Sequence, residues 1–462
     1  MGSEETVSES YDLMVIGAGP GGVAAAVRGR QLGAKTALVE AAHWGGFCLN
    51  RACVPTKLFA AAVERRRGLA TAARMGLRDV GGEIDPGALW ALKEELVSYF
   101  AQGTEGLLKA KGVSLLTGRG RLSGPGRVAV GESLYEANAV ILAVGAAWGR
   151  PDFPGAGLAG VVHPGRLIEE ADIPASALVL GAGPWALEWA QFLAACGCRV
   201  TVAARERGLL PGFDPEIGQR LRNAWKNEPI AFLTGCRVVR AEEHPEGGLA
   251  VTLSVKDREE TRRFERAIHF ERRPGLEGLG LESVGLKDLR VNERLATAVP
   301  GLWAVGDATG CFPDLSHGAT AMGVIAAENA LGAHRAYDPR RVPRIAFTSP
   351  QAASVGLSEE EAEEAGGEVI TGTAAIAAGP MAMIQGAAHG VVKVVGDKRY
   401  GELLGVHVLS PFATEIIGAG VLALQMEATL EELADAALPH PTIAESLAEA
   451  AREALGRTLF LP

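Results

Sequence analysis

The stretch YDLMVIGAGPGGVAAAVRGRQLGAKTALVE, residues 11–40, has the pattern of a strand, a glycine-rich turn, a helix and a second strand. Its apolar run Leu13–Ile16 is typical of a buried parallel strand. Gly17, Gly19 and Gly22 follow at GxGxxG spacing. The first glycine permits a tight turn, the second lets the backbone approach a pyrophosphate, and the third lets helix and strand pack closely. Free N–H groups at the helix N-terminus can bind the phosphates, so the stretch predicts a dinucleotide-binding unit.

A second stretch repeats this pattern. SALVLGAGPWALEWAQFLAACGCRVTVAAR, residues 176–205, places Gly181, Gly183 and Ala186 at the same spacing. A single GxGxxG motif is weak evidence for dinucleotide binding. Two glycine-rich turns that bind no ligand could show the same sequence pattern. Because each motif lies inside a complete β-α-β pattern, we predict two dinucleotide-binding units.

The residues after the second strand of each unit differ. Glu40 ends that strand in the first unit, where a carboxylate binds ribose hydroxyls, and this favours FAD. In the second unit Arg205 and Arg207 follow the strand, and a guanidinium suits a 2′-phosphate. We therefore favour NADP over NAD for the second unit. The alternative is that Arg205 and Arg207 belong to a run of charged residues on a solvent-exposed loop and bind no phosphate.

The bulk properties set limits on the function. A chain of 462 residues predicts two to four domains, since domains usually have about 100–200 residues. A net charge of -10 argues against nucleic acid or an anionic membrane as a partner. No apolar stretch is long enough to span a bilayer. The N-terminus MGSEETVSES is acidic and unlike a signal peptide, so we expect a disordered tail and a cytoplasmic protein.

The six cysteines are sparse for a chain of this length, which argues against a disulfide framework. Cys48 and Cys53 form a close pair, and in a reducing compartment such a pair is more often catalytic or metal-binding than structural. Neither belongs to a Cys/His cluster with zinc spacing, so we expect no metal site.

The segment GGFCLNRACVPTK, Gly45–Lys57, resembles the redox-active motif of the pyridine nucleotide–disulfide oxidoreductases. Its cysteines stand at the start of a predicted helix, whose N-terminus favours the reactive thiolate. The resemblance implies that Cys48 exchanges with the substrate disulfide and that Cys53 exchanges electrons with the flavin.

The resemblance extends over nearly the whole chain. VPGLWAVGDATG, residues 299–310, resembles the second FAD motif, with Asp307 at the ribityl chain, and the stretch from Leu315 resembles the segment that lines the flavin ring. Further positions that the resemblance assigns to FAD are Gly46, Gly120, Ala143 and Gly145.

The remaining catalytic residues are also implied by the resemblance. HPTIAE, residues 440–445, is similar to the acid–base motif, with His440 as acid–base and Glu445 orienting it. An imidazole suits this role because its unperturbed pKa is about 6.5. Lys57 and Glu188 match an ion pair beside the flavin. In the family this histidine reaches the cysteines of the other subunit, which implies a homodimer with shared active sites.

We expect an α/β fold with two Rossmann-like dinucleotide-binding domains and a C-terminal α+β dimerisation domain. The expected segments are 1–150 and 272–340 for FAD, 151–271 for NAD(P), and 341–462 for dimerisation. In the last segment RIAFTS, GVVKVVGD and GELLGVHVL read as antiparallel strands, followed by helices around Phe412–Met426 and Ile443–Leu455.

Within the family, HPTIAESLAEAAREA and CLNRACVPTK most resemble the dihydrolipoamide dehydrogenase branch. This implies oxidation of a dihydrolipoyl group, or the reverse, on a carrier protein or multienzyme complex. The chain departs from the usual pattern at several positions, which are Phe47, Val144, Pro184, Trp185, Glu271 and Leu438.

Two alternatives stay open. The same chemistry could serve another disulfide, a metal ion or a specialised carrier. Alternatively, Trp185 and Glu271 impair nicotinamide binding, and the chain is a flavoprotein subunit that transfers electrons within a complex.

Overall fold

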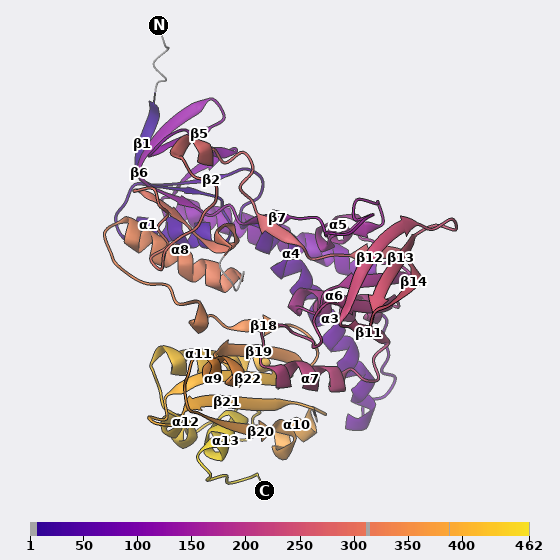
Figure 1. The fold of residues 1–462 in the computed structure, drawn as a ribbon. Coiled ribbons are helices and arrows are strands. Elements are labelled where there is room, and N and C mark those ends of the chain that lie inside the picture. The colour runs from indigo at the N-terminus through magenta and orange to yellow at the C-terminus, as the bar shows by residue number, and fades with distance from the viewer. Residues whose placement is uncertain (1–6, 311–314, 388, 462) are drawn as a thin grey trace. The chain divides into compact units, whose positions relative to one another are not determined.

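The computed structural model describes residues 7–310, 315–387 and 389–461, which belong to two compact units (Figure 1). The first unit comprises Met1–Pro55, Gly87–Gly149 and Glu271–Pro339. The second comprises Thr56–Pro86, Arg150–Phe270 and Arg340–Pro462. The division into the four expected domain segments stays a prediction.

The first unit is built on a seven-stranded sheet of order β3-β2-β1-β6-β5-β4, with β17 beside β6. Its central strands β3, β2, β1, β6 and β17 run parallel, whereas β4 and β5 pair antiparallel at the edge. The strands are β1 Val7–Ile16, β2 Thr36–Glu40, β3 Ser114–Thr117, β4 Gly120–Leu122, β5 Arg127–Val130, β6 Ser133–Leu142 and β17 Leu302–Ala304. A separate antiparallel pair joins β7 Ala146–Trp148 to β16 Arg272–Pro274.

Both faces of this sheet are buried, as the continuous apolar run in β1 predicts. Leu13 and Val15 pack with residues of three helices, α1 Pro20–Gln31, α4 Pro86–Ala110 and α8 Ser316–Ala330. Met14 and Ile16 belong to the cluster on the other face, which includes residues of β4, β5 and the segment 276–291.

Helices α1 and α8 are in close contact (Figure 1). Glycines make this possible, because a Cβ on Gly323 would lie 2.1 Å from the carbonyl oxygen of Gly21. An ion pair between Arg28 and Glu328, 2.7 Å long, links the same two helices. The start of α8 is therefore held in a set position relative to the turn that precedes α1.

The prediction of a disordered N-terminal tail is wrong for residues 7–10, which belong to β1. β1 begins at Val7, and its first part pairs with β6 in the register Val7↔Leu134 and Glu9↔Tyr135. The side chains there are polar and largely exposed, so side-chain composition did not reveal a strand that backbone pairing stabilises. The first six residues of the expected tail lie outside the described residues.

The second unit contains a parallel sheet of order β11-β10-β9-β15-β8, with α6 Pro184–Ala195 following β9. A three-stranded antiparallel sheet, β12-β13-β14, is also part of this unit. The strands are β8 Val161–Val162, β9 Ser176–Leu180, β10 Arg199–Ala204, β11 Ile230–Thr234, β12 Cys236–Glu243, β13 Leu249–Val255, β14 Arg258–Phe264 and β15 Arg266–Ile268.

The C-terminal part of the second unit is an antiparallel five-stranded sheet, β18-β19-β22-β21-β20, as the alternating apolar runs predict. The strands are β18 Arg344–Ala346, β19 Gln351–Gly356, β20 Val369–Ala375, β21 Val391–Asp397 and β22 Leu403–Ser410. The two expected helices are α11 Ala413–Gln425 and α13 Glu445–Ala454, with α12 Leu430–Asp435 between them. The expected fold class, two Rossmann-like domains and a C-terminal α+β domain, is confirmed.

The remaining α-helices are short and connect other elements, except α3, which has 20 residues. They are α2 Gly46–Arg51, α3 Cys53–Ala72, α5 Pro164–Glu170, α7 Pro215–Ala224, α9 Glu359–Glu364 and α10 Pro380–Ile384. The 3₁₀ turns are Ala73–Met75, Leu281–Val284, Gly306–Thr309, Pro339–Arg341 and Ile376–Ala378.

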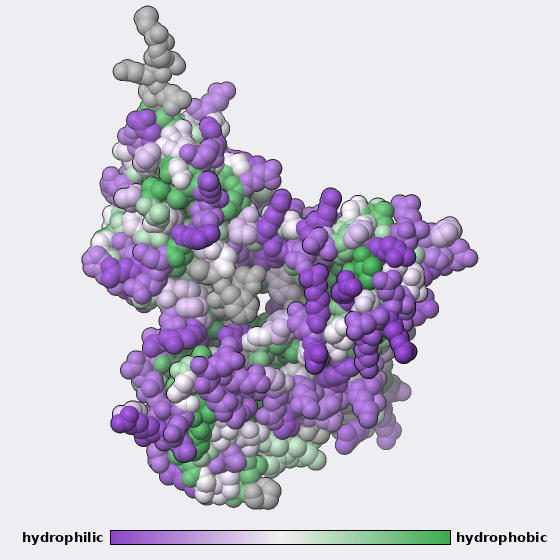
Figure 2. Space-filling view, in the orientation of Figure 1, coloured by the Kyte–Doolittle hydropathy of each residue, from purple (hydrophilic) through white to green (hydrophobic). Residues whose placement is uncertain are grey.

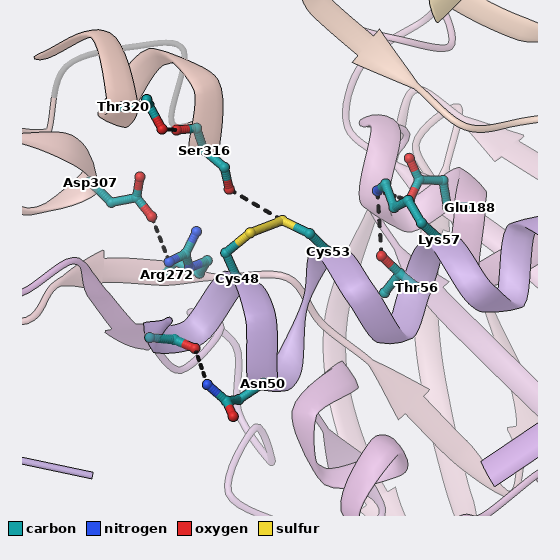
Figure 3. The surroundings of a disulfide bond; sticks show 11 residues. Cys48, Asn50, Cys53, Thr56, Lys57, Glu188, Arg272, Asp307, Ser316 and Thr320 are labelled. Atoms are coloured by element: carbon teal, nitrogen blue, oxygen red, sulfur yellow. Dashed lines mark hydrogen bonds and ion pairs between the residues drawn. A yellow bond between two sulfur atoms is a disulfide. The ribbon is translucent and has the colours of Figure 1, made fainter. Parts of the chain in front are cut away.

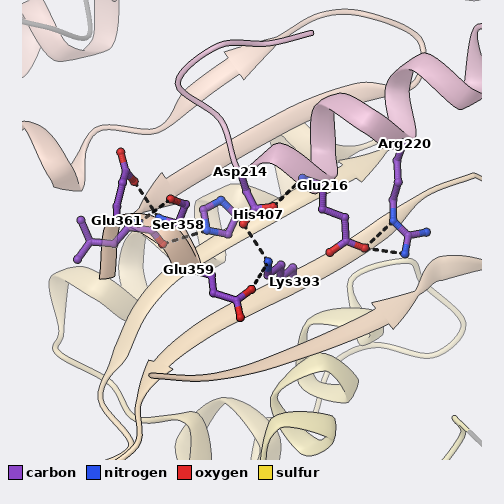
Figure 4. Close-up of polar contacts among 9 residues, drawn as sticks. Asp214, Glu216, Arg220, Ser358, Glu359, Glu361, Lys393 and His407 are labelled. Carbon is purple, nitrogen blue, oxygen red and sulfur yellow. Dashed lines mark hydrogen bonds and ion pairs between the residues drawn. The ribbon is translucent and has the colours of Figure 1, made fainter. Parts of the chain in front are cut away.

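A buried ion pair ties α7 to the C-terminal sheet (Figure 4). Asp214 caps α7 by accepting from the backbone N of Glu216, and its other oxygen lies 3.1 Å from Lys393 Nζ in β21. Asp214 is 2% exposed and Lys393 7%. Burial disfavours the ammonium, but the bonds to Glu359 and Asp214 outweigh it and raise the pKa of Lys393. The lysine is therefore charged, and it neutralises the carboxylate inside the packed core.

Hydrophilic side chains cover most of the face drawn in Figure 2. In the part of the chain that the structure describes, no helix is both long and apolar enough to cross a bilayer.

Replacing Lys393 with methionine should destabilise the protein by about 3–5 kcal/mol, because the substitution leaves the buried Asp214 carboxylate without its counterion. Denaturant unfolding followed by circular dichroism measures this. The matched control is Glu359→Gln, whose side chain is 40% exposed and should contribute only about 0–1 kcal/mol. Equal losses in the two variants would contradict the assignment.

Candidate active site

The glycine turn of the first unit has the geometry that a dinucleotide needs. Gly17 has a φ of 103°, and a Cβ on Gly22 would lie 1.7 Å from the carbonyl oxygen of Gly17. A Cβ on Gly17 would itself lie 2.5 Å from the Ala143 carbonyl oxygen. Gly19 has open space around it, and no side chain caps α1 and no acidic residue stands in its first turn. The turn therefore offers uncapped N–H groups and room for a phosphate.

Glu40 lies at the end of β2, next to this turn. Its carboxylate accepts hydrogen bonds from the backbone N of Ala18 and of Ala42, both 2.8 Å long. These bonds hold the acid at the turn, where the ribose hydroxyls of a dinucleotide would meet it.

The turn of the second unit repeats this geometry. Gly181 has a φ of 112°, Gly183 has no neighbour within 4 Å of a built Cβ, and Ala186 is buried. Helix α6 also lacks a side-chain cap and an acidic first turn. Arg205 and Arg207 are exposed just after β10, and neither guanidinium pairs with a residue that the structure describes.

The other positions expected at FAD also belong to the first unit. Gly120 is buried in β4, where a Cβ would lie 2.9 Å from Ile16 Cγ2. Gly145 has a φ of 66°. Leu315 is the residue before α8, and its carbonyl accepts from the backbone N of Ala319.

The redox cysteines lie on two consecutive helices (Figure 3). Cys48 is in the short α2, and Cys53 is the first residue of α3. The prediction of one helix missed the break at Ala52, whose φ of -136° and ψ of -89° are not helical. This break brings the two Cα atoms to 4.9 Å, and the sulfurs form a disulfide.

The disulfide is attached directly to the glycine turn. Gly46 has a φ of 60°, and a Cβ there would lie 2.6 Å from the Cα of Gly19. The side-chain amide of Asn50 donates to the carbonyl oxygens of Gly46 and Trp44, at 2.8 Å and 3.1 Å, and closes the segment on itself. On the other side, the hydroxyl oxygen of Ser316 lies 3.2 Å from the sulfur of Cys53.

In the second unit, Lys57 and Glu188 form a partly buried ion pair, 2.8 Å long (Figure 3). Glu188 is 6% exposed, and its second oxygen accepts from the backbone N of Phe347 at 2.9 Å. The Lys57 ammonium lies 4.5 Å from the centre of the Phe347 ring. Lys57 and Phe347 also line a small cavity of about 210 Å³, together with Gln191.

His440 and Glu445 form a second pair in this unit. His440 Nδ1 lies 2.9 Å from Glu445 Oε1, and the backbone N of Thr442 donates to Oε2 at 2.9 Å. Burial raises the pKa of Glu445, but these two hydrogen bonds outweigh burial and give a net lowered pKa. The carboxylate therefore stays charged and orients the imidazole, whose other nitrogen is available on an exposed ring.

Comparisons with known proteins agree with this geometry. Residues 11–323 match the family described as pyridine nucleotide-disulphide oxidoreductase, and residues 342–451 match its dimerisation domain. This chain belongs to that family.

Its relatives cover nearly the whole chain. A dihydrolipoyl dehydrogenase of Thermus scotoductus is 40% identical over 453 residues, 96% of this chain and 97% of that protein. A dihydrolipoyl dehydrogenase 3 of Pseudomonas aeruginosa is 34% identical, covering 98% and 99%. A mercuric reductase of Streptomyces lividans is also 34% identical, covering 96% of each chain. The chain is thus an FAD-dependent disulfide oxidoreductase that uses a nicotinamide cofactor, as the resemblance predicted.

Sequence reasoning missed several contacts within this family framework. The Asp307 carboxylate, expected at the ribityl chain, lies 2.7 Å from the Arg272 guanidinium. Arg272 in turn lies 4.9 Å from the centre of the Phe47 ring, and this ring packs edge-on against Trp148. The motif FERRPG and the unusual Phe47 were visible in the sequence, but no sequence pattern indicated that Arg272 contacts Phe47. Phe347 and Ser316 were missed for the same reason.

Replacing Gly46 with alanine should reduce FAD retention by about tenfold or more. The added Cβ would displace the redox segment from the glycine turn, and a cost of only about 1.4 kcal/mol changes affinity tenfold. The FAD-to-protein absorbance ratio after gel filtration measures the loss. Gly33→Ala is the control, because Gly33 also has a positive φ but no neighbour within 4 Å. Equal FAD loss in both variants would show that backbone strain, not the contact, is responsible.

Proposed function

We propose that this chain oxidises dihydrolipoyl groups and passes the electrons to a pyridine nucleotide, with NADP favoured over NAD. The observation that carries the proposal is the Cys48–Cys53 disulfide, attached through Gly46 to a dinucleotide turn. The names of the relatives in Thermus and Pseudomonas support the dihydrolipoyl substrate. A lipoyl-bearing carrier protein or multienzyme complex is the corresponding partner.

The first steps are thiol–disulfide exchange. A substrate thiolate attacks the sulfur of Cys48, the S–S bond breaks, and the sulfur of Cys53 leaves with the electron pair. The second substrate thiol then attacks the mixed disulfide, which releases the substrate as a cyclic disulfide and leaves both protein sulfurs reduced. His440 accepts the proton of the first substrate thiol, and Glu445 stabilises the imidazolium. The proton of the second substrate thiol passes to the sulfur of Cys48 as it leaves the mixed disulfide. FAD, when bound, supplies the path by which the electron pair leaves the sulfurs for the nicotinamide.

The residues of the two turns would hold the cofactors. The N-terminus of α1 suits the pyrophosphate of FAD, and Glu40 suits its ribose. The resemblance assigns further FAD contacts to Gly46, Gly120, Ala143, Gly145, Asp307 and Leu315. In the second unit, Lys57 would meet the flavin and the nicotinamide, and Glu188 keeps its ammonium in place through a bond that also fixes Phe347. We also propose that each His440 serves the cysteines of the other subunit of a homodimer, which the dimerisation domain at 342–451 supports. A cytoplasmic location stays a prediction from composition.

A metal-reducing activity is the second candidate, favoured by the similarity to a mercuric reductase. We rank it lower, because HPTIAESLAEAAREA and CLNRACVPTK most resemble the dihydrolipoamide dehydrogenase branch.

Purified enzyme should turn over dihydrolipoamide, with glutathione disulfide and Hg²⁺ as poor substrates in the reverse direction. Cys53→Ser should lower turnover by at least about 10³-fold, since without the sulfur of Cys53 there is no disulfide for the substrate to attack. Steady-state assays with the three substrates measure this. Cys236→Ser is the control, since Cys236 is a free cysteine distant in sequence. Faster turnover of Hg²⁺ than of lipoamide would favour the second candidate. Failure of micromolar NADPH and NADH to reduce the flavin would favour an electron-transfer subunit.

Replacing Arg205 and Arg207 together with alanine should raise KM for NADPH by about 10–100-fold, because hydrogen bonds to a charged phosphate contribute about 1.5–3 kcal/mol. KM for NADH should hardly change. The matched control is Arg199→Ala, because Arg199 is an exposed arginine at the other end of β10. Equal changes for both nucleotides would contradict the NADP assignment and leave NAD as the cofactor.

A further inference from the structure

The sulfur of Cys53 has a hydroxyl neighbour for which the proposed exchange chemistry has no use. Ser316 Oγ lies 3.2 Å from Cys53 Sγ (Figure 3). A disulfide sulfur carries no hydrogen, so the hydroxyl is the donor in this contact. Cys48, the other half of the disulfide, has no hydrogen-bond donor among the residues that the structure describes. The two sulfurs therefore have different surroundings.

The scaffold holds this contact from both sides. Cys53 is attached to the glycine turn through Gly46, which packs on Gly19. Ser316 is the first residue of α8, and α8 packs on α1 through the close approach of Gly323 to Gly21. Both partners are thus anchored by backbone contacts to the same turn and the helix that follows it.

The surroundings of the pair favour negative charge on sulfur. Cys53 is the first residue of the 20-residue α3, and Ser316 is the first residue of the 15-residue α8. The positive ends of two helix dipoles are therefore near the contact. No side chain caps α8 and no acidic residue stands in its first turn, so no described residue in that turn offsets this field. Thr320 donates its hydroxyl to the carbonyl oxygen of Ser316 and leaves the Ser316 hydroxyl free to face the sulfur.

We propose that Ser316 is a catalytic hydrogen-bond donor that stabilises the thiolate of Cys53 once the disulfide is reduced. This rests on the proposed function, in which the sulfur of Cys53 leaves with the electron pair. When the S–S bond breaks, the Ser316 O–H points at the new anion, and hydrogen bonds to charged acceptors are the strong ones. The donor biases the reduced pair so that Cys53 carries the negative charge and Cys48 the proton, which leaves Cys48 a thiol until His440 activates it.

The test measures thiolate formation at Cys53 without a lipoyl substrate. In FAD-loaded Cys48→Ser protein, the rate of iodoacetamide alkylation of Cys53 is followed against pH by peptide mass spectrometry. Mass spectrometry separates Cys53 from the other thiols, and burial raises the pKa of Cys196 to about 11 and that of Cys198 to about 12, so these react slowly near neutral pH. Adding Ser316→Ala should move the midpoint of the alkylation profile upward by about one pH unit.

Two further variants make the result specific. Ser316→Thr keeps a hydroxyl and should keep the midpoint near that of the parent. Thr320→Ala removes the hydroxyl one turn along the same helix, and it should leave the midpoint unchanged. Alanine is the best helix former, so Ser316→Ala should fold, and circular dichroism checks this. The long-wavelength thiolate–flavin absorption band, titrated in the same variants, should shift with the alkylation midpoint.

An unchanged midpoint in Ser316→Ala overturns the proposal, as does an equal shift in Ser316→Ala and Thr320→Ala. These outcomes are distinct from a failure of the proposed function. Absence of dihydrolipoamide turnover in the unmodified enzyme would reject the substrate, whereas the alkylation profile depends only on Cys53 and its neighbours.

Discussion

The contact on which the redox chemistry of this protein depends is the approach of Gly46 to Gly19. A Cβ at Gly46 would lie 2.6 Å from the Cα of Gly19, so the backbone of the redox segment rests directly on the backbone of the dinucleotide turn. The same turn leads into α1, on which α8 packs through a second glycine contact, between Gly323 and Gly21. Because backbone atoms make these contacts, the disulfide and the start of α8 keep their positions without relying on flexible side chains.

The second unit supplies charged groups that are held in a similar way by shared partners. Glu188 accepts from Lys57 and from the backbone of Phe347, so one buried carboxylate fixes both a cation and a loop. Glu445 accepts from Thr442 and from His440, and these bonds keep its carboxylate ionised. Glu188 is buried, and a buried carboxylate with two donors is far less costly than an unpaired one, which explains why this charge is compatible with a packed fold.

Much of this arrangement could be predicted from the sequence. The two glycine motifs, the redox segment and the alternating strands of the C-terminal sheet led to the confirmed fold class. Other features could not be predicted, because they depend on segments far apart in the chain. Glu9 and its neighbours look like a polar tail but pair with β6, and Arg272 meets Asp307 only after both have folded. The break at Ala52 was hidden because neither Ala52 nor the residues on either side of it are glycine or proline, the usual signals for the end of a helix.

The sequence by itself determined the local elements of this protein. These are glycines at turns whose backbone angles disfavour other residues, a cysteine pair at a helix start, and a histidine followed five residues later by a glutamate. Their physical basis is local, since backbone angles and short spacings decide them. Only the tertiary structure decided which distant groups touch. Cys53 and Ser316 are separated by 263 residues, and Lys57 and Glu188 by 131. Such contacts depend on how helices pack on sheets, and a one-dimensional pattern does not contain that information.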